Sequence, residues 1–274
     1  MELHLVLPNL WGFGLTKVGI ATNSSIRVAL THIPGCIYLQ GSFDSINRGG
    51  LDVRINLHCH SILSDGVLLP SEIMQRVAVM GFDALAITDH VDASNIEVTI
   101  SSLLELVREQ PNDWGIPLLV GVELTHVAPQ SIAKLARRAR TLGAEVIVVH
   151  GETPVEPVAP GTNRAAIASP DVDILAHPGF ITSEEARLAA ERGCLIEITT
   201  RHGHSLTNGH VAHVCREANA RMVVNSDAHT PSDFVTLEFA QRVARGAGLT
   251  TVEAWNATVT EPHVVLEKVL AARQ

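Results

Sequence analysis

Short runs of apolar residues recur along the chain from Leu51 onward, and segments with helical periodicity lie between them. The run around Val146–Val149 is apolar at every position, as is typical of strands that are covered on both faces. The segments Ser71–Met80 and Ser131–Leu142 place apolar residues at helical spacing, and Ser183 with two following acids marks a further helix start. The predicted strands are Val53–Leu57, Ala84–Thr88, Leu118–Glu123, Glu145–Val149, Asp173–Ala176, Leu195–Ile198 and Met222–Asn225. Strands that alternate with helices predict βαβ units and a parallel sheet.

The seven runs predict seven βα units, and we expect an α/β fold with the sheet closed or nearly closed into a barrel. An open, doubly wound sheet is the alternative arrangement. Its dinucleotide-binding form lacks support, because no G-x-G-x-x-G motif follows a predicted strand.

The first 50 residues differ from the rest. They contain clusters of Gly, Asn, Ser and Thr without a sustained period, and they end in the turn-like sequence Asn47–Gly50. The pattern predicts an N-terminal extension over residues 1–50 and a barrel domain over residues 51–274. The sequence leaves open whether this extension is ordered.

The amino-acid composition excludes some classes of function and favours others. The net charge of −9 and the aromatic content of 4% argue against nucleic acid and anionic membranes as general partners. No apolar run reaches the roughly 18–20 residues of a membrane span. The four cysteines form no C-x-x-C pair, which favours a reducing, cytoplasmic location. The 14 histidines stand out, because neutral imidazole is the commonest side-chain metal ligand.

Histidines and acids gather where the predicted strands end. Since the carboxyl ends of parallel barrel strands share one face, we expect these side chains to meet there. The pairs His58/His60 and Asp227/His229 have a spacing of two, which puts both side chains on one side of an extended backbone. So many buried polar groups would be costly unless metal ions bind them, and the sequence therefore predicts a metal site.

Four ordered motifs resemble the PHP family, named for polymerases and histidinol phosphatases, over about residues 51–260. The motifs are His58-Cys59-His60-Ser61 with Asp65-Gly66, Thr88-Asp89-His90, His177-Pro178-Gly179, and Ser226-Asp227-Ala228-His229. The resemblance implies a distorted seven-stranded (βα) barrel, TIM-like, with a metal site at the carboxyl ends of the strands.

The resemblance also implies two to three divalent metal ions, with zinc, manganese and iron left open because imidazole and carboxylate suit all three. It implies that Glu123 bridges two ions and that Asp89 and Glu197 orient metal-bound groups. The implied ligands are His58, His60, Asp65, His90, Glu123, His150, His177, Asp227 and His229.

The reaction that the resemblance implies is hydrolysis of a phosphoester by metal-activated water, and the family's substrates include histidinol phosphate, sugar phosphates, nucleotides and oligonucleotide ends. The small chain and the low aromatic content favour a small phosphomonoester, so we expect a small phosphorylated metabolite as the substrate. Asp227, His229 or a bound water would protonate the leaving group, and Glu123 would act through the metals. We expect Arg201, Arg164 and His204 to contact the substrate, because each lies in a loop or helix start that follows a strand. His126 and His204 also lie close to the predicted mouth of the barrel.

Two alternatives remain. The first is an amidohydrolase-type C–N hydrolase, but that class often uses a modified lysine where this chain has His150. The second is a non-catalytic metal-binding PHP-like domain. Such domains have lost metal ligands, whereas this chain keeps every ligand that the resemblance implies, which argues against this alternative.

Overall fold

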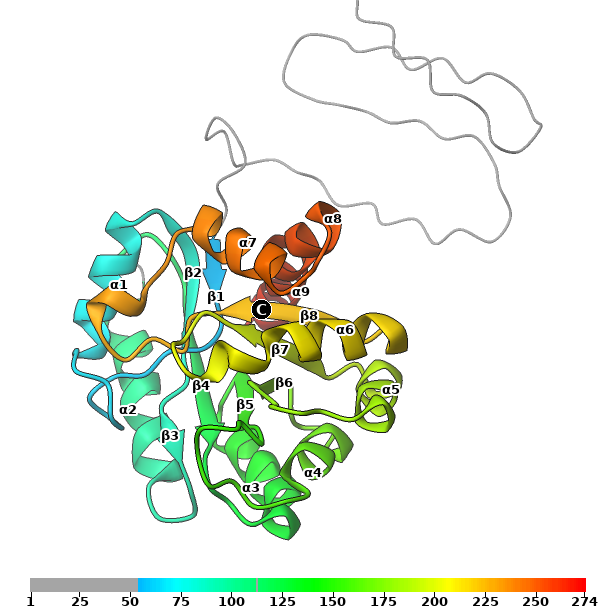
Figure 1. The fold of residues 1–274 in the computed structure, drawn as a ribbon. Helices are drawn as coiled ribbons and strands as arrows, with labels where there is room; N and C mark the ends of the chain where they lie inside the picture. The colour runs from blue at the N-terminus through cyan, green and yellow to red at the C-terminus, as the bar shows by residue number, and fades with distance from the viewer. Residues whose placement is uncertain (1–53, 112) are drawn as a thin grey trace, which may run out of the picture. The chain divides into compact units, whose positions relative to one another are not determined.

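The protein is described by a computed structural model that covers residues 54–111 and 113–274. The predicted extension over residues 1–50 lies outside the described residues, so the boundary before the barrel domain stays a prediction. The described part is a mixed α/β fold in which parallel strands curve into a nearly closed barrel with helices around it (Figure 1).

The strands pair in parallel in the order β1-β2-β4-β5-β6-β7-β8, and the two-residue β3 pairs with β4. Because β3 follows β2 after two residues and pairs with the same neighbour, the barrel has the seven strand positions that the sequence predicts. The bounds are β1 Arg54–Asn56, β2 Phe82–Ile87, β3 His90–Val91, β4 Leu118–Leu124, β5 Val146–His150, β6 Ile174–Ala176, β7 Leu195–Thr199 and β8 Met222–Asn225.

The first and last strands meet beyond their regular ends. Cys59 and Ala228 form an isolated parallel bridge, and the His60 amide donates to the Ala228 carbonyl at 2.8 Å. The Asp227 amide donates to the His58 carbonyl at 3.0 Å. The barrel is thus joined between β1 and β8 at the level of the first and last histidine motifs.

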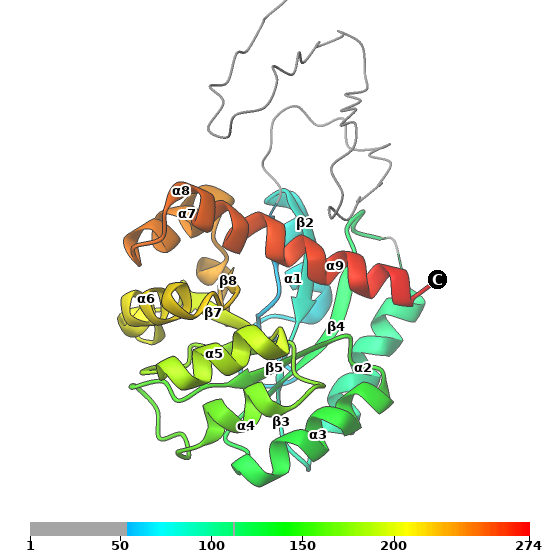
Figure 2. The ribbon, with the colours of Figure 1, turned by 90° about the vertical axis from the view of Figure 1, so that its right-hand side faces the viewer.

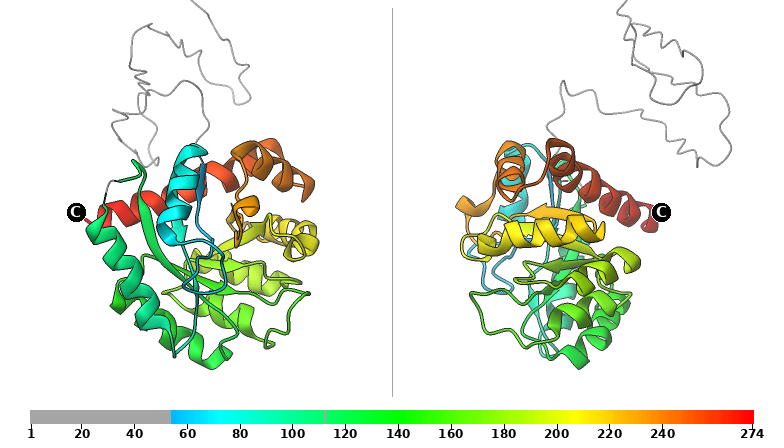
Figure 3. Two further views of the ribbon diagram at one scale, coloured as in Figure 1. Left: turned by 90° about the vertical axis from the view of Figure 1, so that its left-hand side faces the viewer. Right: turned by 45° about the vertical axis from the view of Figure 1, so that its right-hand side comes forward.

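Helices follow the strands and cover the outside of the curved sheet (Figure 3). Their bounds are α1 Pro70–Val79, α2 Ile96–Glu109, α3 Pro129–Leu142, α4 Thr162–Ala168, α5 Ser183–Arg192, α6 Asn208–Ala218, α7 Leu237–Gly246, α8 Thr251–Trp255 and α9 Glu261–Ala272. The short 3-10 helices are η1 His204–Thr207 and η2 Pro231–Asp233, and the π-helical turn η3 Asn256–Thr260 joins α8 to α9.

Helix α5 begins at Ser183 as predicted, but the residue that caps it lies one position earlier. Thr182, not Ser183, is the N-cap: its hydroxyl accepts from the Glu185 amide, and the Glu185 side chain accepts from the Thr182 amide. This reciprocal pair satisfies two free donors at the helix start. Of the described helices, none is long and apolar enough to cross a membrane.

The last helix, α9, lies against the amino ends of the strands (Figure 2, red). Val265, Leu266 and Val269 are buried in one apolar cluster with inward-facing strand residues such as Ile55 and Val146. Near its end, Arg273 donates to the Leu118 carbonyl at 2.7 Å, at the first residue of β4. The amino end of the barrel is therefore closed by apolar packing. The candidate polar site lies at the opposite, carboxyl end of the strands.

Candidate metal centre

Glu123, the penultimate residue of β4, lies at the centre of the carboxyl end and is fully buried. Its shortest contact joins Oε2 to His90 Nδ1 at 2.6 Å. Its oxygens lie within 4 Å of ring nitrogens of five histidines: His58, His60, His90, His150 and His177. One carboxylate with both oxygens among so many imidazoles has the geometry that a bridging ligand requires.

All nine ligands that the sequence predicts lie together at this end of the barrel. They form four overlapping groups, and within each group one ligand atom per residue lies within 4.8 Å of the others. The groups are His60/Asp65/His90/His229, His58/His177/Asp227, His58/His60/Glu123 and Glu123/His150/His177. Because Glu123 belongs to two groups, its position fits the bridging role that the family resemblance implies.

The residues present fit divalent metal ions. Among the described residues, both ring nitrogens of His177, Glu123 Oε1 and His60 Nδ1 are buried without a hydrogen-bond partner. Leaving such an atom unsatisfied costs about 1–3 kcal/mol. A divalent ion of the class that imidazole and carboxylate suit would satisfy His177 Nε2 and Glu123 Oε1, which face each other at 3.6 Å.

Further side chains fix the orientation of these groups. Glu197 is fully buried and its Oε2 lies 2.8 Å from His58 Nδ1, which leaves Nε2 of that ring to face the centre. Asp89 accepts from the Ser61 amide and hydroxyl, both at 2.7 Å, and so fixes the loop after the first motif. Glu197 thus contacts a predicted ligand directly, whereas Asp89 bonds to Ser61 and Ser64, and the orienting roles of both acids stay predictions.

Burial and charge set the protonation of the centre. Burial, helped by neighbouring imidazoles, holds the pKa values of His60 and His177 well below the usual range, so both rings are neutral donors. Burial raises the pKa of Asp227 to about 7. Burial also opposes protonation of His58, but the carboxylates around it outweigh this and raise its pKa. Divalent cations would replace protons on these same atoms.

The backbone is strained at two predicted ligands. His177 has φ of 28° and Asp227 has φ of 49°, in the region that non-glycine residues rarely adopt. Such conformations cost of order 1–3 kcal/mol and cluster at functional sites. His177 directly follows β6, and Asp227 lies two residues after β8. The turn at each strand end therefore directs the side chain toward the centre.

A cavity of about 200 Å³ opens above the buried carboxylate and is lined by ten of the described residues. Predicted site residues among them include Asp227, His229, Arg201 and His204. The Arg201 guanidinium donates to the Asp227 carbonyl at 3.1 Å, and its Nε lies 3.5 Å from Asp227 Oδ2. His204 is buried and shares a hydrogen bond with Thr153 Oγ1 at 2.8 Å.

Arg164 is not among the residues that line this cavity. It extends from α4 into solvent and pairs with Glu184 of α5 at 2.7 Å, both side chains being exposed. The structure thus brings Arg201 and His204 to the site but not Arg164, whose substrate contact stays a prediction without support from its position.

Sequence reasoning missed Glu156, which also lines the cavity. It lies in the loop between β5 and α4, and its carboxylate faces three histidine rings. No spacing rule could have found it, because it lies in an irregular loop six residues after His150 rather than at a strand end.

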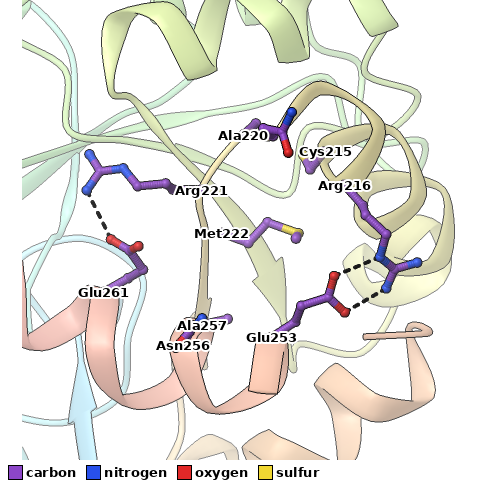
Figure 4. A pocket seen from close by; sticks show the side chains of 10 residues that line it. Cys215, Arg216, Ala220, Arg221, Met222, Glu253, Asn256, Ala257 and Glu261 are labelled. Carbon is purple, nitrogen blue, oxygen red and sulfur yellow. Dashed lines mark hydrogen bonds and ion pairs between the residues drawn. The ribbon is translucent and has the colours of Figure 1, made fainter. Parts of the chain in front are cut away.

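Another cavity, of about 230 Å³, lies at the amino end of β8 (Figure 4). Its arginines are already paired: Arg216 with Glu253 at 2.8 Å and Arg221 with Glu261 at 3.1 Å. Cys215 lines it too, but burial raises the pKa of this thiol to about 12. With its charges neutralised and its thiol protonated, this cavity offers little reactive chemistry.

The fold and the site together define a barrel protein whose carboxyl end carries histidines and carboxylates that suit divalent metal ions. Residues 56–165 match the PHP domain. An uncharacterized protein of Methanocaldococcus jannaschii is 46% identical over 218 residues, which cover 79% of this chain and all of that protein. The chain belongs to the PHP family.

Two further likenesses concern ribonuclease P. Ribonuclease P protein component 3 of Methanosarcina mazei is 26% identical over 225 residues, which cover 77% of this chain and 87% of that protein. A chain in a cryo-EM structure of archaeal ribonuclease P with mature tRNA has a TM-score of 0.59 and 16% identity, covering 80% of this chain and 91% of that chain. This structural likeness shows the shared fold alone.

Proposed function

We propose that the protein is a metal-dependent phosphoesterase that hydrolyses a small phosphomonoester. The observation that supports this most is the set of buried donor atoms without partners around Glu123, which fits bound divalent cations beneath a cavity open to substrate. Zinc, manganese and iron all suit these donors.

The charge of the loaded site favours a phosphate dianion. Asp65, Glu123 and Asp227 supply three negative charges, whereas two or three divalent ions would supply about four to six positive charges. Arg201 adds a further positive charge at the cavity. The centre would therefore attract an anion even though the chain as a whole has a net charge of −9.

The size of the cavity favours a small ester. Pockets for drug-sized ligands run to about 300–1,000 Å³, whereas this cavity has about 200 Å³. A guanidinium binds phosphate oxygens through two parallel hydrogen bonds, so Arg201 is placed to contact oxygens that do not react.

The roles of the protein's own groups follow from their positions. When bound, divalent ions supply Lewis acidity, which lowers the pKa of water and neutralises phosphoryl oxygens. Glu123 is buried below the cavity and positions this chemistry. Asp227 and His229 line the cavity, so either of them, or a bound water, would pass the proton that the attacking water releases to the leaving oxygen.

Metal analysis and a phosphatase screen test this proposal together. We expect two to three equivalents of metal in gently purified protein and turnover of at least one phosphomonoester from a metabolite panel with manganese or zinc. Glu123→Gln should lose at least one ion and most of this turnover, because a bridging carboxylate serves two ions. Glu191→Gln, an exposed change on α5, is the matched control and should match the wild type in both.

Two results would contradict the proposal. One is a fully loaded wild-type centre that holds a single ion. The other is full metal content without turnover of any phosphoester, which would favour the non-catalytic alternative. A C–N hydrolase gains no support from the site, since none of the residues that line the cavity is a lysine.

The likeness to ribonuclease P component 3 makes a place in an RNA-processing assembly the second candidate. A protein that binds RNA directly needs Lys and Arg to neutralise phosphates, and the excess of acids in this chain disfavours that role. Titration with a structured RNA separates the two: salt-sensitive binding would favour the second candidate over the first.

A further inference from the structure

Glu156 forms the centre of a second polar cluster, nearer the solvent than the nine predicted ligands. Its Oε2 lies 3.1 Å from His150 Nε2 and 3.4 Å from His126 Nε2. Its Oε1 lies 3.3 Å from His204 Nε2. Three imidazoles from three different loops or strand ends thus face one carboxylate, and only His150 belongs to the nine.

The two nitrogens of His150 face different centres. Nδ1 lies 3.5 Å from Glu123 Oε1 on the inner side, whereas Nε2 faces Glu156. The residue is 3% exposed, and its Nε2 has no hydrogen bond of acceptable geometry among the described residues. A buried nitrogen that faces a carboxylate oxygen without bonding to it leaves a lone pair available for another partner.

The two carboxylate oxygens of Glu156 face different histidines, which leaves one oxygen on the side where a cation would bind. His204 shares a hydrogen bond with Thr153 through Nδ1, which turns its Nε2 toward Glu156 Oε1. Oε2 therefore lies on the side of His126 and His150.

The distances permit a single ion. One ligand atom from each of His126, His150 and Glu156 lies within 4.8 Å of the others. Bonds from zinc to nitrogen or carboxylate oxygen are about 2.0–2.2 Å, so ligands on opposite sides of one ion stand roughly 4 Å apart or less. Two histidines and one glutamate also form a known catalytic type of zinc set, with the remaining position open.

We propose that His126, His150 and Glu156 bind an additional divalent transition-metal ion, which we call the outer ion, at the mouth of the cavity. His150 binds it through Nε2 and keeps the proton on Nδ1, directed toward Glu123. His204 holds the carboxylate in place. The inner ions are then bound by the other eight predicted ligands.

Exposure distinguishes the outer ion from the inner ones. The side chains of His126 and Glu156 are 46% and 36% exposed, whereas those of His58 and Glu123 are fully buried. We therefore expect the outer ion to be lost first when a chelator is added.

The test is zinc content per chain, measured by elemental analysis after loading and desalting the full-length protein. Wild type should bind one zinc ion more than either Glu156→Gln or His126→Ala. His202→Ala, which removes an exposed histidine from the loop before η1, is the matched control and should bind as much as wild type. Circular dichroism of each variant checks that the fold is kept.

Anomalous diffraction from zinc-loaded crystals gives an independent readout. We expect a peak about 2.0–2.2 Å from His150 Nε2, His126 Nε2 and a Glu156 oxygen. Equal zinc content in wild type and both variants, or an ion on His150 Nδ1 with none beside Glu156, would overturn the outer ion. Neither readout needs turnover, so a protein without phosphatase activity would still decide this question.

Discussion

At the scale of single residues, Arg201 is the cavity-lining side chain that we propose to contact the substrate. It lies two residues after β7, whose buried Glu197 orients His58 instead of facing the cavity. The end of this strand is thus free for a substrate contact. Arg201 already lies beside Asp227 and 3.8 Å from Asp233, so its guanidinium is oriented before any ligand binds.

We predict that Arg201→Ala lowers kcat/KM for the best phosphoester by about 10–1000-fold, or roughly 1.4–4 kcal/mol of transition-state binding. Arg201→Lys should recover only part, because a point charge cannot reproduce the two parallel bonds. Metal content and melting temperature should not change. Arg137→Ala, an exposed arginine on α3, is the control. A kcat/KM equal to that of the wild type in Arg201→Ala would contradict a role of Arg201 in substrate binding.

At the scale of elements, the turns after the strands are shaped by glycines that approach other backbone closely. Gly179, in the turn after His177, has φ of 62°, and a Cβ there would lie 1.9 Å from the Glu152 carbonyl oxygen. Gly81, at the end of α1, has φ of 81° and nothing within 4 Å of such a Cβ. The two positions share a backbone conformation and differ in the space around it.

We therefore expect Gly81→Ala to lower the free energy of unfolding by about 1–2 kcal/mol, because alanine is strained in the left-handed conformation. That corresponds to a fall of roughly 2–8 °C in melting temperature for a domain of this size. Gly179→Ala should cost clearly more and should also weaken metal binding, because Glu152 must move and the turn carries His177. Thermal melts of both variants with and without zinc measure the difference. Equal melting temperatures for the two variants would show that the turn at Gly179 accommodates a Cβ without additional strain.

At the scale of the whole molecule, the barrel is a complete unit within the described residues. The bridge between Cys59 and Ala228 joins its first and last strands, and α9 covers its amino end. The Methanocaldococcus relative is matched along its entire length by 79% of this chain, so about a fifth of this chain has no counterpart in it. All nine predicted ligands lie within the described residues, so truncation can test the prediction of a separate extension over residues 1–50.

Deleting residues 1–50 should leave a soluble, folded protein with unchanged metal content. The physical reason is that all nine predicted ligands and the apolar clusters come from residue 54 onward. Size-exclusion chromatography, circular dichroism and elemental analysis of the truncated chain check this. Insoluble protein, or loss of metal on truncation, would show that the segment covers part of the barrel.

Local pattern was enough to place the strands, because strands covered on both faces must be apolar throughout. The predicted and observed bounds of β8, Met222–Asn225, are identical. The other six predicted strands differ by one or two residues at an end, and the two-residue β3 was not predicted. The predicted strands also led us to expect that histidines and acids at their ends meet, since parallel strands share one carboxyl face. The set of nine ligands came from the resemblance to the PHP family and stays a prediction, although the structure brings all nine together.

What the sequence could not decide lies in loops and in contacts between distant segments. Glu156 reaches three histidines only because the loop from Gly151 to Gly161 folds back over the barrel mouth, which no periodicity encodes. Arg164 turns toward Glu184, because helix α4 presents it to α5 and not to the cavity. Helix α9 closes the amino end through packing with residues more than 100 positions away. Backbone periodicity is local and can be read along the chain, whereas these placements depend on which surfaces meet after the barrel has formed.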